Sequence, residues 1–372
     1  MRRSVLLCAL LVSIALSFAV PRSASAAPVQ VTMDPPQFTT PTTALLVGTV
    51  TGRTQVSIDQ LVGTRWRAVQ SVTADSRGFY GATVPATTTP TYYRARAWTA
   101  TSPQVLVQVE PEPPGPSDAC GEQPKKADGT YWSCTFVDDF NGTVLNRTMW
   151  RPQTEFRTGS PNAWACYIDD PSVVALGGGS LNLTVNRLPV QKPCAGQNGE
   201  MTQYVAGMVT TYHRFSQQYG RFEARIKNKA TQVPGLQESF WLWPDDRYNT
   251  EVWPKAGEID IAETYSQYPK LAIPFLHYTE NDNGGPVPGL NTAQNCPADR
   301  GVYNTYTLEW TATRIEILIN GKSCLVNTSG DPAFKKPYII ALTQLLGVGG
   351  NAKRFNTPLP ATMNIDYVHV WN

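Results

Sequence analysis

The sequence predicts an all-β protein, with a small β-sandwich followed by a large β-jelly-roll sandwich. Short runs of β-branched and aromatic residues recur along the chain, separated by Thr, Gly and Pro turns, and sustained helical periodicity is absent. The chain has 372 residues, of which 41% are hydrophobic and 16% charged, so it is long enough for two domains. Residues 110–118 (EPEPPGPSD) contain four prolines and predict a stiff linker between them.

The first 26 residues have the pattern of a secretory signal peptide. Arg2 and Arg3 precede an apolar run over 4–20, and Ala24-Ser25-Ala26 supplies small residues for cleavage. A membrane anchor is the alternative, but the run is short for a span. We therefore expect a secreted, extracellular protein.

The charge of the remaining chain excludes some partners. Losing the three arginines of the leader lowers the formal charge from +2 to −1. The remaining chain therefore lacks the excess positive charge that is typical of nucleic-acid-binding proteins. No other apolar run approaches the length of a membrane span. We expect no nucleic-acid or membrane partner, and a monomer.

Residues 28–109 predict the smaller sandwich. Its strands are expected at 45–50, 55–61, 65–72, 78–84, 92–98 and 104–109. The segment is similar to the immunoglobulin-like modules appended to secreted bacterial enzymes. Trp66 and Trp98 could form a sugar-stacking face, but we favour core or framework positions for both.

Residues 119–372 predict the larger sandwich, whose concave sheet could hold a chain-like ligand. Strands are expected at 180–186, 207–212, 220–226, 258–263, 305–310, 314–319 and 364–371. Asn320-Gly321 predicts a two-residue hairpin.

Six cysteines follow the predicted leader, and an even number in an exported chain predicts disulfides. Six cysteines allow 15 connectivities. We expect nearest neighbours to pair, as Cys120–Cys134, Cys166–Cys194 and Cys296–Cys324. Zinc is the alternative, but CxxC and CxxH spacings are missing.

Residues 257–263 (GEIDIAE) hold three carboxylates on one predicted strand. Alternation places Glu258 and Asp260 on one face, and a β-bulge at Ile261-Ala262 would return Glu263 to that face. Such a row of like charges is costly because neighbouring carboxylates raise each other's pKa. This cost points to a glycoside-cleaving pair, and a solvated acidic strand is the alternative.

Further motifs surround this stretch in a fixed order. They are 136–142 (FVDDFNG), Trp150, 219–227 (YGRFEARIK), 239–244 (SFWLWP), 253–263 (WPKAGEIDIAE), 277–278 (HY), 306–310 (YTLEW), 319–321 (ING) and 365–371 (IDYVHVW). Together they cover nearly all of 135–371. This region resembles glycoside hydrolase family 16, in the laminarinase-like branch with a bulged signature.

The resemblance implies a retaining, double-displacement mechanism that requires no cofactor. Glu258 would be the nucleophile, Glu263 the general acid and then base, and Asp260 the partner that fixes Glu258. The resemblance also implies substrate contacts at Trp253, Trp241, Trp164, His277 and Tyr265. A structural Ca²⁺ would be held by Asp139, Gly142 and Asp366, whose oxygen ligands suit this ion.

Two segments depart from the laminarinase pattern, at 160–167 (SPNAWACY) and 346–354 (LGVGGNAKR), and Gln344 stands where Asn is usual. These positions shape the sugar subsites, so the linkage stays open. We expect an endo-acting hydrolase of β-1,3-linked glucan. The alternatives are a galactan or cell-envelope polysaccharide as substrate, transglycosylation, or a non-catalytic sugar-binding jelly roll.

Overall fold

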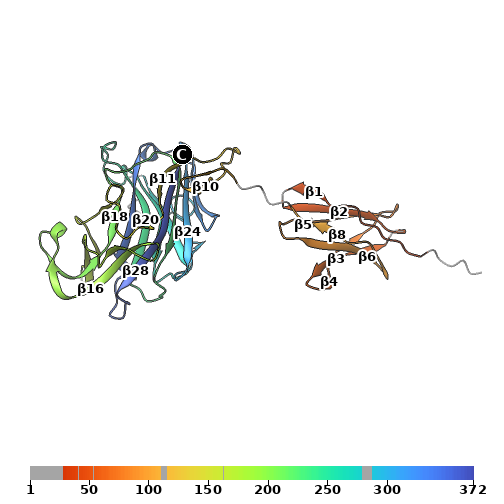
Figure 1. Cartoon of the computed structure of the whole chain (residues 1–372), viewed down its shortest axis with the longest axis horizontal. Helices are drawn as coiled ribbons and strands as arrows, with labels where there is room; N and C mark the ends of the chain where they lie inside the picture. Colours follow the sequence, from red (N-terminus) through yellow and green to blue (C-terminus); the bar gives the residue numbers. More distant parts are fainter. Residues whose placement is uncertain (1–27, 41, 53, 110–114, 162, 279–286) are drawn as a thin grey trace, which may run out of the picture. The chain divides into compact units, whose positions relative to one another are not determined.

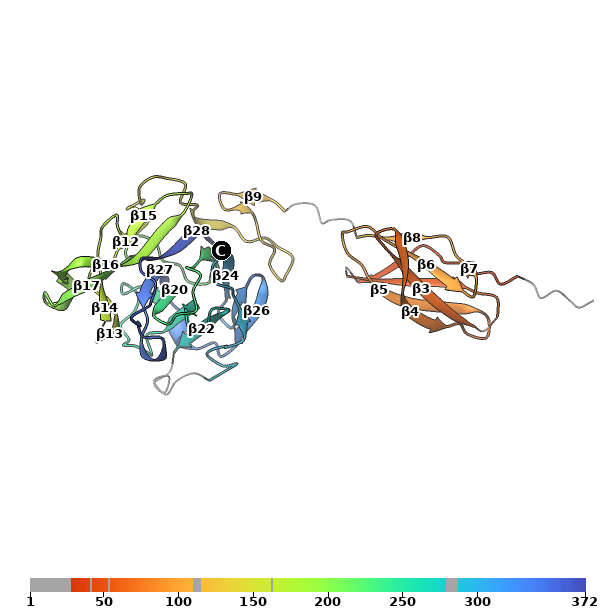
Figure 2. The same ribbon diagram turned by 90° about the horizontal axis from the view of Figure 1, so that it is seen from below.

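The computed structural model describes residues 28–40, 42–52, 54–109, 115–161, 163–278 and 287–372 (Figures 1 and 2). These residues form two compact units, one on each side of residues 110–114. Within the described ranges, the regular elements are β-strands and short 3₁₀ helices. None of these described helices is long and apolar enough to cross a membrane. The predicted signal peptide lies outside the described residues.

The first unit (28–109) is built from two sheets around one core. One sheet has the order β1-β2-β5, with β1 Gln37–Thr40, β2 Thr43–Thr49 and β5 Phe79–Pro85. The other has the order β4-β3-β6-β7, with β8 also paired to β6; its strands are β3 Gln55–Val62, β4 Arg65–Thr73, β6 Thr91–Ala97, β7 Ala100–Thr101 and β8 Val105–Val107. Every second residue of β2 and β5 is buried, as expected for strands with one core face. The immunoglobulin-like assignment stays a prediction.

The two tryptophans of this unit are not core residues. Trp98 is 76% exposed, and its indole N–H donates to Thr54 Oγ1 at 3.2 Å. Trp66 is half-buried on β4, with the guanidinium carbon of Arg94 4.4 Å from its ring centroid. The core prediction is therefore wrong for Trp98.

The predicted linker is shorter than the sequence indicates. Strand β9 (Ser117–Asp118) pairs with β10 (Gly121–Glu122) inside the second unit. Asp118 also accepts hydrogen bonds from the backbone N–H groups of Cys120 at 2.9 Å and Cys134 at 2.8 Å. These bonds make 117–118 part of the second unit, beside its first disulfide.

The second unit (115–372) is a jelly-roll sandwich of two large sheets. The seven-stranded sheet has the order β12-β18-β27-β20-β21-β22-β23. Its strands are β12 Arg151–Pro152, β18 Met208–Thr210, β20 Leu236–Pro244, β21 Glu258–Tyr265, β22 Leu271–His277, β23 Cys296–Pro297 and β27 Tyr338–Leu346.

The second sheet of this unit has eleven strands, in the order β13-β14-β17-β16-β28-β19-β24-β25-β26, with β11 also paired to β28 and β15 to β16. Its strands are β11 Cys134–Asp138, β13 Arg157–Ser160, β14 Ala163–Tyr167, β15 Val174–Leu176, β16 Leu181–Pro193, β17 Met201–Ala206, β19 Gly220–Lys227, β24 Tyr303–Trp310, β25 Ile315–Ile319, β26 Lys322–Asn327 and β28 Ala361–Trp371.

The core lies between these two sheets. Strand β19 buries Phe222, Ala224 and Ile226 in strict alternation, and Phe240 and Ile259 approach the same core from the seven-stranded sheet. Each fully buried side chain of this size contributes roughly 1.5–3 kcal/mol relative to exposure. The opposite face of the seven-stranded sheet is thereby left free to carry polar residues.

Two local predictions for this unit are confirmed. All three nearest-neighbour disulfides form, Cys120–Cys134, Cys166–Cys194 and Cys296–Cys324. The β25–β26 hairpin turns through Asn320 and Gly321, whose φ angles of 51° and 73° are those that a two-residue turn of this kind requires.

Candidate active site

Strand β21 lies between β20 and β22 in the seven-stranded sheet, and its pairing contains one extra residue. Asp260 is opposite Phe275 and Glu263 is opposite Ile273, so two residues of β21 face one residue of β22. The register with β20 shifts at the same place. This is the position at which the sequence predicts a bulge. Because of it, Glu258, Asp260 and Glu263 all line one hollow of about 260 Å³, which we call the catalytic hollow.

Glu258 is held from two sides. The indole N–H of Trp253 donates to Glu258 Oε2 at 2.8 Å, and His277 is the residue opposite Glu258 on β22. His277 Nε2 also lies 3.3 Å from Asp260 Oδ2, and its ring centroid is 5.3 Å from that of Trp253. Asp260 is only 5% exposed. The structure therefore places Glu258, Asp260, His277 and Trp253 in one contact group.

Glu263 has a different set of partners. The side-chain amide of Gln237 on β20 donates to Glu263 Oε1 at 2.8 Å. Tyr265, two residues along β21, makes a second side-chain hydrogen bond to Glu263. Tyr265 is thus placed against a carboxyl group of the site. Gln237 is a contact that the sequence did not indicate, because a glutamine on a predicted strand carries no distinctive signal.

The family to which the chain belongs follows from comparison with known proteins. The family model described as "Glycosyl hydrolases family 16" matches residues 168–367, more than half of the chain. The chain belongs to glycosyl hydrolase family 16.

Two curated relatives of this family 16 chain have different printed activities. It is 26% identical over 262 residues to glucan endo-1,3-beta-glucosidase A1 of Niallia circulans. This match covers 63% of this chain and 37% of the relative. It is 27% identical over 252 residues to keratan-sulfate endo-1,4-beta-galactosidase of Sphingobacterium multivorum, with 65% and 56% covered. The chain thus spans about a third to a half of the length of these relatives.

Solved structures show the same fold. The catalytic domain of an endo-1,3-beta-glucanase (laminarinase) from Thermotoga petrophila matches with a TM-score of 0.54 at 20% identity, covering 65% of this chain and 98% of that one. The endo-beta-1,3-glucanase from Pyrococcus furiosus matches with a TM-score of 0.55 at 21% identity, covering 66% and 96%. These neighbours confirm the predicted jelly roll of the family 16 unit.

The environment of the site raises the pKa values of Glu258 and Glu263 above the ordinary value of a glutamate. Burial, with the neighbouring charge of Asp260 adding to it, raises the pKa of Glu258 to about 8, against the opposing effects of His277 and the Trp253 N–H. Burial also raises the pKa of Glu263, while Tyr265, His277 and Gln237 act to lower it. Carboxyl groups that share one hollow titrate as a set and do not all ionise at neutral pH. The family 16 site can therefore hold one protonated and one ionised carboxyl group.

A buried ion pair supports the strands behind this site. Arg300 donates to both carboxylate oxygens of Glu238 on β20, at 2.6 and 2.8 Å, and both side chains are at most 3% exposed. Thr264 of β21 donates to the same carboxylate at 2.8 Å. Gln344 of β27 is fully buried and donates to Glu238 at 3.1 Å. Gln344 therefore lies in this support, and the prediction that it shapes a sugar subsite is wrong.

The predicted sugar contacts Trp241 and Trp164 differ in position. Trp241 is half-buried, lines the catalytic hollow and donates from its indole N–H to Thr343 Oγ1 at 2.8 Å. Trp164 is only 6% exposed and packs with the Cys166–Cys194 disulfide, while the guanidinium of Arg157 lies 5.1 Å from its ring centroid. Trp164 therefore exposes little ring surface, and the sugar contact expected there stays a prediction.

The residues predicted to bind calcium do not fit that ion. The carboxylate of Asp139 lies 2.8 Å from His369 Nε2, and Asp366 accepts a hydrogen bond from the guanidinium of Arg225. Both carboxylates of the predicted site thus already have side-chain partners from the protein, with which Ca²⁺ would have to compete. The structure gives Gly142 no ligand role, and we do not place calcium here.

Proposed function

We propose that the chain is a secreted, retaining endo-β-glycan hydrolase that acts on β-1,3-linked glucan. The observation that carries this proposal is the arrangement of Glu258, Asp260 and Glu263 on one bulged strand, with separate partners for Glu258 and Glu263. Three disulfides agree with an oxidising, extracellular location. A monomer stays a prediction.

In the first step of the proposed reaction, Glu258 attacks the anomeric carbon and forms a glycosyl–enzyme ester. Glu263 simultaneously gives its proton to the departing sugar oxygen, so the glycosidic bond breaks as the ester forms. The attacking form of Glu258 is the carboxylate, which the N–H of Trp253 and the charge of His277 stabilise against the opposing effect of burial that raises its pKa to about 8. Attack by Glu258 therefore becomes more favourable as the pH approaches that value. Asp260 keeps His277 in place and repels negative charge on Glu258, which makes that carboxylate a less stable and more reactive nucleophile.

In the second step, the ionised Glu263 takes a proton from water, which attacks the anomeric carbon and releases Glu258. The hydrogen bonds from Gln237 and Tyr265 stabilise the ionised Glu263 that this step needs. Two inversions give net retention. The chemistry uses only carboxyl groups and water, so no cofactor is required.

The choice of glucan rests on the printed names of relatives and on the aromatic rings near Glu258. Trp253 is 39% exposed and Trp241 is half-buried in the catalytic hollow, so each offers a surface for sugar stacking. A galactan is the second candidate, because the galactosidase relative is as similar to this chain as the glucosidase relative.

The proposal is tested by hydrolysis of laminarin, mixed-linkage glucan, agarose and an unsulfated galactan. We expect laminarin to be cut internally, with early products of mixed length and a β-anomer seen first by NMR. Release of sugar products from galactan alone would show that the substrate is a galactan and not a β-1,3-glucan. An α-anomer seen first would refute the retaining mechanism. Glu258→Ser should abolish hydrolysis yet still bind laminarin, and wild-type turnover by that variant would exclude Glu258 as nucleophile.

A further inference from the structure

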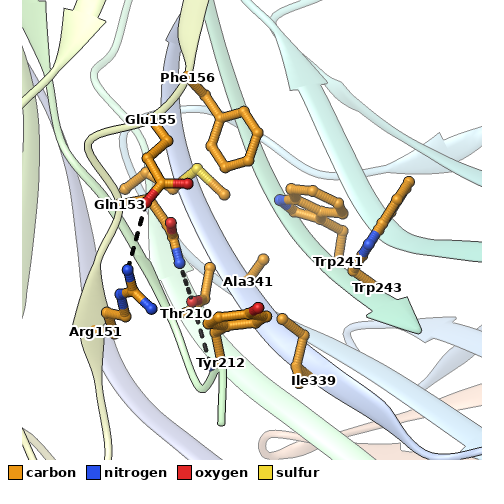
Figure 3. A pocket seen from close by; sticks show the side chains of 11 residues that line it. Arg151, Gln153, Glu155, Phe156, Thr210, Tyr212, Trp241, Trp243, Ile339 and Ala341 are labelled. Carbon is orange, nitrogen blue, oxygen red and sulfur yellow. Dashed lines mark hydrogen bonds and ion pairs between the residues drawn. The ribbon is translucent and has the colours of Figure 1, made fainter. Parts of the chain in front are cut away.

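A second hollow adjoins the catalytic hollow on the same face of the seven-stranded sheet. We call it the distal hollow and define it by Trp241, Trp243, Tyr212, Thr210, Arg151 and Glu155 (Figure 3). Its volume is about 380 Å³. Phe156, Met208 and Trp241 line both hollows, so the two are continuous.

The strand register places the distal hollow on a line that starts at β21 and runs across the sheet, perpendicular to its strands. Asp260 on β21 is opposite Trp241 on β20, and Trp241 is opposite Ala341 on β27. The line continues from Ala341 to Thr210 on β18 and from Thr210 to Arg151 on β12. Four steps of about 4.8 Å separate β21 from β12, or roughly 19 Å. Such a distance accommodates several sugar units beyond the cleaved bond.

Two small residues, Ala341 and Thr210, lie next to each other in the middle of this line, between Trp241 and Arg151. Ala341 and Thr210 form a low floor, and Trp241 and Trp243 stand on one side with their ring centroids 6.0 Å apart (Figure 3). Tyr212 borders the floor, and its hydroxyl donates to Asp246 at 2.5 Å, which fixes the ring. Aromatic rings around a floor of small residues match the flat, apolar faces of pyranose rings.

Polar groups complete the distal hollow on the side facing the tryptophans. The guanidinium of Arg151 lies 3.5 Å from Glu155, and Gln153 donates to Thr210 at 2.8 Å (Figure 3). An adjacent guanidinium and carboxylate offer donors and acceptors together, which suits sugar hydroxyl groups because each hydroxyl both donates and accepts.

The charges around both hollows oppose an anionic sugar. Arg151 and Arg157 are the cationic arginines of the described lining, and each is paired with a carboxylate, Arg157 with Glu200 at 2.7 Å. The three carboxyl groups of β21 add negative charge. A sulfate or uronate group entering here would find no unneutralised arginine among the described lining residues, and it would be repelled from the catalytic end.

We propose that the distal hollow binds neutral hexopyranose units of the substrate, away from the cleaved bond, and selects neutral glycans over sulfated or carboxylated ones. This inference rests on the proposed function and narrows its substrate class. Trp243 would be the stacking residue, because the Tyr212 ring is already stacked on His213 at a centroid distance of 3.9 Å and has the Arg151 guanidinium 5.3 Å from its centroid. The Arg151–Glu155 pair would set the charge preference.

The stacking role is tested with a short and a long neutral β-1,3-gluco-oligosaccharide. Trp243→Ala should lower kcat/KM on the long substrate by roughly tenfold, as expected for a lost stacking contact, and much less on the short one. Trp243→Leu, which keeps an apolar side chain, is a second test in case the first variant does not fold, and Phe79→Ala, at an exposed aromatic of the first unit, is the control. Equal losses on both substrates, or no loss on the long one, would overturn the stacking role.

The charge preference is tested with laminarin and carboxymethylated laminarin, which share one backbone. The Glu258→Ser form is titrated with both, so that binding is measured even if hydrolysis of laminarin fails. We expect weaker binding of the carboxymethylated form, and Glu155→Gln should narrow this difference by leaving Arg151 unneutralised. Tighter binding of the charged form, or a difference that Glu155→Gln leaves unchanged, would refute the preference. Binding of laminarin by Glu258→Ser without hydrolysis of laminarin by the wild type would count against the proposed function alone.

Discussion

Replacing Glu258 by Gln should stabilise the second unit although it removes the proposed nucleophile. The substitution keeps the side-chain shape and an oxygen that can accept from Trp253. It removes an ionisable group whose pKa burial raises from 4.5 to about 8. Because the folded state holds this proton more tightly than the unfolded chain, wild-type stability falls as pH rises from about 4.5 to about 8.

The size of this effect follows from the raised pKa of Glu258. At pH 7 the solution is about 2.5 pH units above the unfolded pKa of 4.5, whereas the folded site still holds its proton. At 1.36 kcal/mol per pH unit, ionisation of Glu258 therefore stabilises the unfolded chain by about 3.4 kcal/mol relative to the folded one. Glu258 lies in an open hollow, where solvent weakens the effect, so we expect about 2 kcal/mol. For a unit of this size, that gain corresponds to roughly 4–8 °C in Tm.

The assay is thermal unfolding of wild type and Glu258→Gln by calorimetry, between about pH 4 and pH 8.5. The Tm gap should be near zero at about pH 4 and should widen in favour of the variant up to about pH 8. A gap that stays constant with pH, or a variant less stable than wild type at pH 8, would refute this account of Glu258.

Glu316→Gln is the matched control because its expected pH dependence has the opposite sign. Burial acts to raise the pKa of Glu316, but hydrogen bonds from Ser323 and Arg314 outweigh it and hold that pKa below its ordinary value. Wild type therefore gains stability from Glu316 above its unfolded pKa and loses it as pH falls. The control variant should be less stable than wild type at neutral pH, with a gap that closes in acid.

Three further outcomes are expected. Arg300→Met should lower stability by about 3–5 kcal/mol in denaturant unfolding, because it leaves Glu238 buried without its cation; adding Glu238→Leu should restore part of the loss, and a double variant less stable than the single one would contradict this. Gln237→Leu should move the basic limb of the kcat/KM profile to higher pH, since it removes a hydrogen bond that lowers the pKa of Glu263; an unmoved or lowered limb would exclude that role. A chelator should leave the Tm unchanged, because both carboxylates of the predicted calcium site already have side-chain partners in the protein; a lower Tm would show that a metal is bound.

The predictions that held depend on local rules of the chain. Alternation along residues 257–263 determines which side chains share a face, and the inserted residue is visible in the spacing of the carboxylates. The Asn320-Gly321 turn and the disulfides between sequence neighbours likewise involve segments that are close along the chain. Their physical causes act over a few residues to a few tens of residues.

What only the tertiary structure decided is how distant strands face one another. Glu238 and Arg300 are 62 residues apart, and nothing local to either predicts that they meet behind β21. The resemblance implies a sugar contact at Trp164, whereas in the folded chain this side chain packs with the Cys166–Cys194 disulfide and Arg157. The distal hollow likewise depends on sheet order, which brings Arg151, Thr210, Ala341 and Trp241 into one line across four strands. Local spacing determines the reactive groups of this protein, whereas long-range strand pairing determines their partners and the shape of the surface around them.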